Sequence, residues 1–246
     1  MDRIIYTAMT GASAASQRQA VLSNNLANAS TNGFRAEMSA FRAVPLRGDG
    51  ATTRVFTLET TAGYVDTPGQ AQHTGRNLDA MAVGQAWFAV QGLDGTEAYT
   101  RAGRLEVSAD GQLVNSMGQP MLSDQGTPID VPQGAEVTLG DDGTVTARIP
   151  GQQPTTVGRL KLATPTPDDP LKRSDDGLFR TASGDPLPAD PTAKLQSGAL
   201  EGSNVNSVQA MVDMITAARQ FEQQMQLLQT AQSDDKAASQ LLNINA

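Results

Sequence analysis

The sequence predicts a mixed, mainly β protein in which a central antiparallel β domain is flanked by N- and C-terminal coiled-coil-type helices that pair in an assembly. Apolar residues recur at alternating steps of three and four near both chain ends, over 1–29 and 204–242, which is the spacing of a coiled-coil seam. Between these stripes, short apolar or β-branched runs are separated by Asp-Gly pairs. Asp-Gly supplies the positive φ angles that tight β-hairpins require.

The first helix is predicted from a narrow stripe along residues 1–29. The stripe consists of Met1, Ile5, Ala8, Ala12, Ala15, Gln19, Leu22, Leu26 and Ala29. Its small alanines allow a second helix to approach closely. Asn32-Gly33 is expected to end the helix, because glycine tolerates the left-handed conformation of a C-terminal cap.

The central part of the chain has the pattern of short strands. These are expected at 55–58, 87–90, 105–107, 136–139, 144–147 and 158–162. Tight turns are expected at the Asp-Gly pairs that begin with Asp94, Asp110, Asp142 and Asp176, and the thirteen prolines add further turns. We therefore divide the chain into an N-terminal helix at 1–36, an extended connector at 37–80, the β domain at 81–180, a second connector at 181–199 and a C-terminal helix at 200–246.

The C-terminal helix carries a second stripe, rich in methionine. Its strongest positions are Met211, Met214, Ala218, Phe221, Met225 and Leu228. Asn204 or Ser207 is expected to cap its start. Because a narrow stripe is not buried by a lone helix, the two helices either meet neighbours in an assembly or form a hairpin beside the β domain of a monomer. Periodicity alone does not decide between these arrangements.

Composition and charge argue against several classes of function. The chain has 18 Lys and Arg against 26 Asp and Glu, a net charge of −8, without a basic block, so nucleic-acid binding is not expected. No run approaches the roughly 18 apolar residues of a membrane span. Asp2-Arg3 has no net positive charge, and Thr10 and Gly11 interrupt the apolar run that follows. A cleaved signal peptide is therefore not expected either.

The residue types on which most enzymes depend are scarce. The chain has no cysteine and one histidine, His73, which we expect to be an ordinary surface or loop residue. Trp87 is expected in the core, because it lies in an apolar run. Four adjacent Asp pairs are expected to form turns or to be solvated rather than to share an acid–base site, and they begin at Asp141, Asp168, Asp175 and Asp234. We predict no catalytic residue, no cofactor and no metal site, and no enzymatic activity.

Three segments of the chain, in order, resemble the bacterial flagellar rod and hook protein family. The first is Asn24-Asn25-Leu26-Ala27-Asn28 followed by Thr31-Asn32-Gly33-Phe34-Arg35, the second runs through 78–114, and the third begins at Leu200-Glu201-Gly202-Ser203-Asn204 and continues to Glu222. Pro45-Leu46 and the runs 158–162 and 173–179 are similar to the proximal-rod branch of this family. Phe221 departs from it, because many relatives carry tyrosine there.

The resemblance implies a structural axial component of the flagellar basal-body rod, which polymerises through its terminal helices and transmits torque from motor to hook. It implies a periplasmic location and passage through the flagellar type III export apparatus without a cleaved signal peptide. The implied partners are other proteins of the proximal and distal rod and copies of the same chain. The expected assembly contacts are Ile5, Ala8, Ala12, Ala15, Leu22, Asn24, Asn25, Leu26, Asn28, Gly33, Phe34, Met211, Met214, Ala218, Phe221, Met225 and Leu228.

Three alternatives remain open at this point. The chain could be a distal-rod or hook-type member of the same family. In a different class, it could cleave cell-wall glycans, which requires two carboxyl groups about 5 to 9.5 Å apart in an open cleft. It could also be a glycan-binding β module, which requires an exposed aromatic platform.

Overall fold

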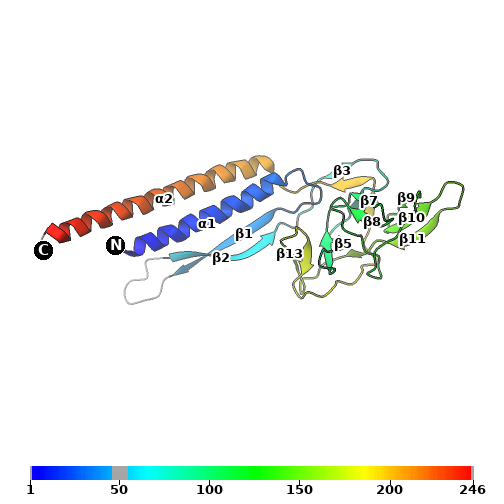
Figure 1. Cartoon of the computed structure of the whole chain (residues 1–246), viewed down its shortest axis with the longest axis horizontal. Coiled ribbons are helices and arrows are strands. Elements are labelled where there is room, and N and C mark those ends of the chain that lie inside the picture. The colour runs from blue at the N-terminus through cyan, green and yellow to red at the C-terminus, as the bar shows by residue number, and fades with distance from the viewer. Residues whose placement is uncertain (1, 46–54, 245–246) are drawn as a thin grey trace. The chain divides into compact units, whose positions relative to one another are not determined.

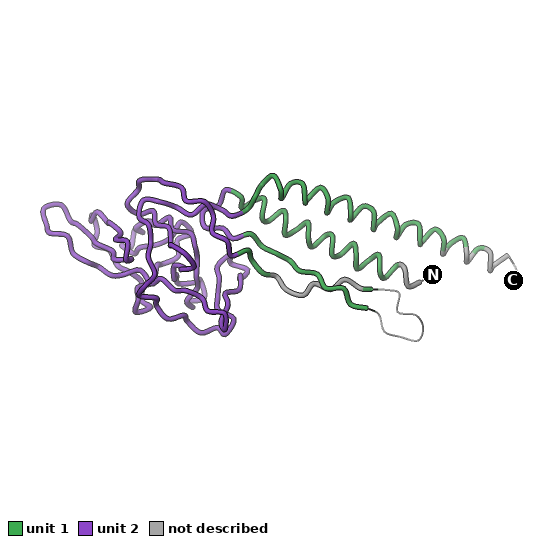
Figure 2. The backbone as a smooth tube through the Cα atoms, turned by 180° about the vertical axis from the view of Figure 1, so that it is seen from behind, with its two compact units in different colours: residues 1–29, 36–65, 205–246 green, residues 30–35, 66–204 purple. Residues whose placement is uncertain are grey.

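The computed structural model describes residues 2–45 and 55–244, so that the predicted seam position Met1 and the motif residue Leu46 lie outside it. It divides into two compact units, shown in Figure 2. We call residues 1–29, 36–65 and 205–246 the helical unit, and residues 30–35 and 66–204 the β unit. Both units are therefore built from segments that are far apart in the sequence.

The helical unit contains helix α1 (Asp2–Ala27), helix α2 (Ser207–Ile244) and a hairpin of strands β1 (Glu37–Pro45) and β2 (Val55–Tyr64). The two helices lie side by side, and α1 also contacts the hairpin (Figure 1). Gly11 lets the helices approach closely, because a Cβ atom at this position would be 3.0 Å from Cδ of Gln224. The expected helices near both chain ends are confirmed.

The start of α2 differs in detail from the prediction. Neither Asn204 nor Ser207 caps the helix. Instead, the Asn206 Oδ1 atom accepts a hydrogen bond of 3.1 Å from the backbone N–H of Gln209, which is the usual N-cap geometry. The three polar residues are close together in the sequence, so the pattern predicts a cap in this region without selecting the residue.

The hairpin lies where the sequence predicts an extended connector. Its strands pair antiparallel from Glu37 opposite Tyr64 to Pro45 opposite Val55, with a shift in register after Ala40. The β1 sequence is mixed in local preference and includes the weak strand former Ala40. Pairing with β2 and packing on α1 therefore supply what local propensity does not.

The β unit consists of short antiparallel strands, as the Asp-Gly pattern predicts. Its core sheet has the order β12-β5-β6-β14-β13, a second sheet has the order β11-β10-β9, and three strand pairs complete it, β15-β4, β16-β3 and β7-β8. The strands are β3 (Ala71–His73), β4 (Ala80–Ala82), β5 (Trp87–Gln91), β6 (Glu97–Thr100), β7 (Leu105–Val107), β8 (Leu113–Asn115), β9 (Glu136–Leu139), β10 (Thr144–Arg148), β11 (Thr155–Arg159), β12 (Leu162–Ala163), β13 (Leu171–Arg173), β14 (Phe179–Thr181), β15 (Leu195–Ser197) and β16 (Ala199–Glu201).

The unit extends beyond the predicted β domain at 81–180. Strand β3 lies in the expected first connector and β4 begins at its last residue. Strand β15 lies in the expected second connector, and β16 crosses from it into the expected C-terminal helical segment. Each is only three residues long and pairs with a partner far away in the sequence. Such strands are hard to recognise from the local sequence, because their stability comes from long-range pairing.

The turns between these strands use their aspartates as expected. The glycines of the four predicted Asp-Gly pairs all have positive φ, at Gly95, Gly111, Gly143 and Gly177. Asp142 illustrates the geometry, since its carboxylate accepts hydrogen bonds from the Thr144 N–H at 3.0 Å and the Thr144 hydroxyl at 2.7 Å. These hydrogen bonds stabilise the ionised carboxylate and lower the pKa of Asp142.

Acid should therefore weaken the β unit through its turns. Hydrogen bonds from Thr144 to Asp142, and from Thr192 and Thr164 to Asp190, lower the pKa of each carboxyl below its ordinary value. A carboxyl whose pKa is lower in the folded state contributes stability above its unfolded pKa and loses that contribution as the pH falls through the folded value. The double variant Asp142→Asn/Asp190→Asn should melt below the wild type at pH 7 and approach it at pH 2, as measured by circular dichroism. A deficit that stays constant down to pH 2 would contradict this origin of the stability.

Candidate functional site

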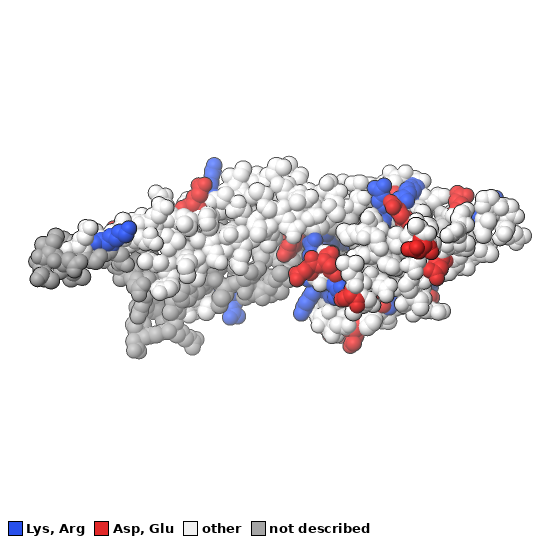
Figure 3. All heavy atoms as spheres, in the orientation of Figure 1, with Lys and Arg blue, Asp and Glu red and all other residues white. Residues whose placement is uncertain are grey.

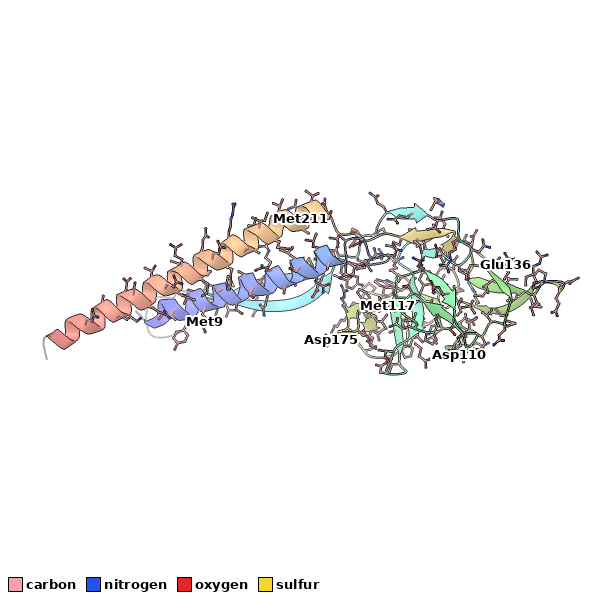
Figure 4. All side chains as sticks on the ribbon, turned by 45° about the horizontal axis from the view of Figure 1, so that its top comes forward. Met9, Asp110, Met117, Glu136, Asp175 and Met211 are labelled. Atoms are coloured by element: carbon pink, nitrogen blue, oxygen red, sulfur yellow. The ribbon has the colours of Figure 1, made fainter. Side chains whose placement is uncertain are left out.

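The carboxylates of the β unit serve the local fold. Asp169 accepts hydrogen bonds from the Ser183 N–H at 3.0 Å and hydroxyl at 2.7 Å, and Asp176 accepts one from the Leu178 N–H at 3.0 Å. Figure 4 shows Asp110, Glu136 and Asp175 in separate parts of the unit. Among the described residues, no group of three His, Asp or Glu side chains is arranged to hold a metal ion. The turn interpretation is thus confirmed for Asp142, Asp169 and Asp176.

Other single-residue expectations can also be placed. His73 is exposed at the end of β3, as expected for a surface residue. Trp87 is fully buried, as expected for a core residue. None of the helices in the described ranges has the length and apolar character needed to cross a membrane.

The predicted stripe of α1 is covered within the helical unit. Ala8, Ala12 and Ala15 are buried, and Ile5 and Leu22 are half-buried. These residues lie on the helix that contacts α2 and the hairpin. The heptad register read from the sequence is therefore the register in which α1 is buried in its own chain.

The asparagines of the first motif attach the end of α1 to the hairpin. Asn25 is buried and pairs with the backbone of Glu37 in both directions: its Nδ2 donates to the carbonyl at 2.9 Å, and its Oδ1 accepts from the N–H at 2.8 Å. Asn28 Nδ2 donates to the carbonyl of Asn24 at 3.0 Å. Leu26 is half-buried beside them. This part of the motif has a clear role within the chain.

On α2, every second position of the predicted stripe is replaced in the structure by the residue that precedes it in the sequence. Met214, Phe221 and Leu228 are half-buried as the prediction requires. The positions between them are Ala210 and Ala217, which are buried, and Gln224, which lies against Gly11. Met211 and Met225 are exposed instead, and Ala218 is half-buried. The predicted stripe follows the spacing through methionines, whereas two alanines and Gln224 occupy these positions in the structure.

A second apolar face of α2 is uncovered in the single chain. Val208, Met211, Val212 and Ile215 are 70%, 51%, 52% and 56% exposed. Their spacing of three, four and seven residues places them on one side of the helix. Met211 is marked on α2 in Figure 4. We call these four residues the α2 patch; the spacing was visible in the sequence, but only Met211 was among the expected contacts.

The surface of the helical unit carries charges unevenly. On the face seen in Figure 3, Lys, Arg, Asp and Glu side chains are sparse on the helices and more frequent on the β unit. Helix α1 has only Asp2, Arg3 and Arg18 as charged residues, whereas on α2 the exposed Arg219 and Glu222 follow the patch on the same side of the helix. An exposed apolar patch that is bordered by charged residues is suited to contact with other proteins.

A second candidate site is a buried charge cluster in the β unit, formed by Arg35, Arg101 and Glu201. Nη1 of Arg35 is 2.6 Å from Oε1 of Glu201, and Nη1 of Arg101 is 3.3 Å from Oε2. All three side chains are at most 1% exposed. Charged groups are rarely buried so completely unless they are paired. Glu201 thus partly balances two cations that come from distant parts of the chain.

Backbone groups complete the cluster. Nη1 of Arg35 donates to the carbonyl of Thr67 at 2.8 Å, and Nη1 of Arg101 donates to the carbonyl of Ala82 at 2.8 Å. Oε1 of Glu201 accepts from the N–H of Gly69 at 2.9 Å. These hydrogen bonds reduce the cost of burying the charges.

Aromatic rings enclose the same cations. The guanidinium carbons of Arg35 and Arg101 lie 5.8 and 5.3 Å from the ring centre of Trp87. Phe179 packs against Trp87 with ring centres 4.6 Å apart. Arg173 lies 4.4 Å over the ring of Phe34, one of the residues that the sequence suggested as an assembly contact. Phe34 is buried within the β unit.

Gly33, another expected assembly contact, closes the cluster. It has φ of 71°, and its N–H donates to the backbone carbonyl of Glu201 at 2.7 Å. A Cβ atom at this position would overlap the main chain of Arg101 and Ala102. Glycine is therefore required here twice, for its conformation and for its lack of a side chain.

Sequence reasoning did not single out Arg35, Arg101 or Glu201 as a site. Each stood inside a segment that carries the family resemblance, but nothing in the local pattern marks a charged residue as buried. The pairing becomes visible only when the fold brings three distant segments together.

Three protein-family models match successive parts of the chain. The flagella basal body rod protein model matches residues 5–35, the flagellar hook protein FlgE/F/G D1 domain model matches 81–147, and the flagellar basal body rod FlgEFG protein C-terminal model matches 196–241. Arg35 lies in the first, Arg101 in the second and Glu201 in the third. The buried cluster thus joins the three matched regions.

Relatives are similar over the whole chain. The flagellar basal-body rod protein FlgF of Salmonella typhimurium and that of Escherichia coli K12 are each 46% identical over 254 aligned residues, which cover 100% of both chains. The flagellar basal-body rod protein FlgG of Agrobacterium fabrum is 32% identical, with 93% of this chain and 95% of the relative covered.

Substitution of Gly33 tests the geometry of the cluster. Gly33→Ala should destabilise the β unit by roughly 3 kcal/mol, since it adds a main-chain clash to the strain of a positive φ. Gly118→Ala is the matched control, because Gly118 also has positive φ but nothing lies within 4 Å of its added Cβ. The control should cost about 1 kcal/mol. Denaturant unfolding followed by Trp87 fluorescence measures both, and equal losses would contradict the close packing described.

Proposed function

The chain belongs to the family of flagellar basal-body rod proteins, and we infer from this that it is a structural component of the basal-body rod of a bacterial flagellum. Its identity to the FlgF proteins of Salmonella and Escherichia coli, 46% over the full length, exceeds its 32% identity to an FlgG protein, whereas the FlgF proteins of Buchnera and Caulobacter are 30% and 31% identical. This difference favours a place in the proximal rod over the distal-rod or hook-type alternative.

We propose that the chain polymerises through its terminal helices and so transmits torque from motor to hook. The observation that supports this proposal is the α2 patch. When another subunit covers apolar side chains that are half or more exposed, their removal from water makes the free energy of association more favourable. Because the predicted α1 stripe and the shifted α2 stripe are already used within the chain, contacts between subunits need a further face, and the α2 patch provides one.

The β unit would contribute stiffness to such a shaft. Its charge cluster ties three distant segments together by ion pairs and hydrogen bonds, so that the segments which lead to both terminal helices are fixed in one core. Residues 30–35 and 199–204 both belong to this core. A subunit that carries torque needs such a connection, because force applied at either end of the chain then reaches the same rigid body.

The proposed partners are other proximal- and distal-rod proteins and copies of the same chain. The proposed location is the rod in the periplasm, reached through the flagellar type III export apparatus without a cleaved signal peptide. The net charge of −8 supports a role without nucleic acid, because binding to the phosphate backbone requires basic residues. Membrane insertion and a cofactor are not part of the proposal.

One hollow of the β unit bears on the glycan-cleaving alternative. It has a volume of about 400 Å³ and is lined in part by Glu97, Asp124 and Lys161. Glu97 is already engaged, with Nζ of Lys161 at 2.8 Å and the hydroxyl of Tyr99 at 2.7 Å. Both partners of this ion pair are almost fully buried and hold each other within the chain, which favours a structural role for the pair.

The protein should therefore release no soluble fragments from peptidoglycan. The measurement is incubation of purified protein with labelled cell wall, with lysozyme as the positive control. Release that is lost in both Glu97→Gln and Asp124→Asn would show that the hollow is an active site and would contradict a purely structural function.

The α2 patch gives the sharper test of assembly. Ile215→Asp should leave the melting temperature of the monomer nearly unchanged, because Ile215 is 56% exposed. It should abolish rods and swimming while export continues, since a charge buried between subunits costs several kcal/mol. Electron microscopy of basal bodies and a motility assay in the host bacterium measure these effects.

Two control variants separate assembly from folding. Gln223→Asp places the same charge at an exposed position of α2 outside the patch and should swim normally. Ala217→Asp places it at a fully buried position and should destabilise the monomer itself. Normal rods in the Ile215→Asp variant would show that the patch does not face another subunit.

A further inference from the structure

We propose that Glu201 is a folding latch: the β unit acquires its native packing only when residues 199–204 dock and their carboxylate meets the two buried arginines. The proposal deepens the function proposed above, on which its role in delivery of the subunit rests. It concerns when the chain folds, and it follows from where the members of the cluster lie along the sequence.

The docking segment is inserted among elements that precede it. Strand β16 pairs with β3, with Ala199 opposite His73 and Glu201 opposite Ala71. Leu200 is buried. Gly69 approaches the carbonyl of Gly202 so closely that a Cβ atom would overlap it. The segment is therefore part of the interior of the β unit and not a tail on its surface.

The same segment also holds the chain that follows α1. The Gly33 N–H donates to the carbonyl of Glu201 at 2.7 Å, and the Asn204 N–H donates to the carbonyl of Phe34 at 3.3 Å. The Asn204 side chain donates to the carbonyl of Thr67 at 2.8 Å. Residues 30–35 and 199–204 thus support each other within the β unit, although most of the chain separates them in sequence.

The buried charge cluster cannot form before the segment at 199–204 has docked. Arg35 and Arg101 are both buried beside Trp87, and Arg35 has no ion pair other than Glu201 among the described residues. Its Nε and Nη2 atoms are buried without a hydrogen-bond partner in the described structure. A core in which these guanidinium groups were buried without Glu201 would leave the Arg35 cation without its counter-charge, which is strongly unfavourable.

Because a polypeptide emerges with its N-terminus first, Arg35 and Arg101 become available for folding long before Glu201 does. We expect the β unit to stay non-native until the segment at 199–204 is free. For a subunit that passes through a narrow export channel, this delay keeps the largest folded part from forming before most of the chain is through. The latch thus regulates the order of export and folding with residues of the chain itself.

The first experiment follows refolding of the purified full-length protein by pulsed hydrogen exchange. The latch requires amides of the central strands β5 and β6 to gain protection at the same rate as amides of β16. Protection of β5 and β6 in a separate, earlier phase would overturn the proposal. Because the assay uses monomers in solution, its result is independent of whether the protein assembles into rods.

The second experiment changes the charge. Glu201→Gln keeps the size of the side chain and an acceptor for the Gly69 N–H, but removes the negative charge that pairs with Arg35 and Arg101. Its melting temperature should fall by roughly 10 °C or more, with a red shift of Trp87 emission. Glu136→Gln, which removes an exposed carboxylate of the same unit, should change the melting temperature by less than about 2 °C.

A charge-free variant separates electrostatics from packing. Arg35→Met/Arg101→Met/Glu201→Gln removes both cations together with the anion and should recover most of the melting temperature lost in Glu201→Gln. Failure to recover it would show that the carboxylate acts through shape or hydrogen bonds alone and would overturn the latch. A Glu201→Gln variant with native Trp87 emission and a wild-type melting temperature would overturn it as well.

Discussion

A carboxylate that is buried away from water is tolerated only where cationic groups compensate its charge. Glu201 meets that condition with Arg35 on one side and Arg101 on the other, both at most 1% exposed. Breaking a buried pair of this kind leaves an uncompensated charge at a cost of about 3–5 kcal/mol. The chain must therefore bring three distant segments to one point, and three features of the β unit serve that requirement: Gly33 at its positive φ, the pairing of β16 with β3, and Trp87 beside both cations.

The two units divide the physical tasks between them. The β unit carries most of the ionic residues and the buried ion pairs, which give it a defined core despite its short strands. The helical unit has few charges on α1 and keeps an apolar patch on α2 outside its own packing. Subunits of a shaft must hold their shape and also bind each other. The buried ion pairs of the β unit suit the first requirement, and the exposed apolar patch of the helical unit suits the second.

Much of the fold could be predicted because its signals are local. The heptad stripe of α1, the long C-terminal helix and the turns that begin with Asp94 and Asp142 all follow from residues within a few positions of one another. Strand β1 and its pairing with the strand expected at 55–58, the strands β3 and β16 and the charge cluster could not be predicted, because each depends on partners far away in the sequence. The α2 register shows the same limit on a smaller scale: the spacing is compatible with Met211 or with Ala210, and only the close approach of α1 selects the alanine.

The central claim is that the terminal helices of neighbouring subunits meet through a face that the single chain leaves open. A map of the intact basal body at side-chain resolution tests it most directly. The account predicts that Val208, Met211, Val212 and Ile215 are covered by a helix of an adjacent subunit, while Arg35, Glu201 and Arg101 keep the contacts they have within one chain. An assembled rod in which these four side chains face solvent would contradict it.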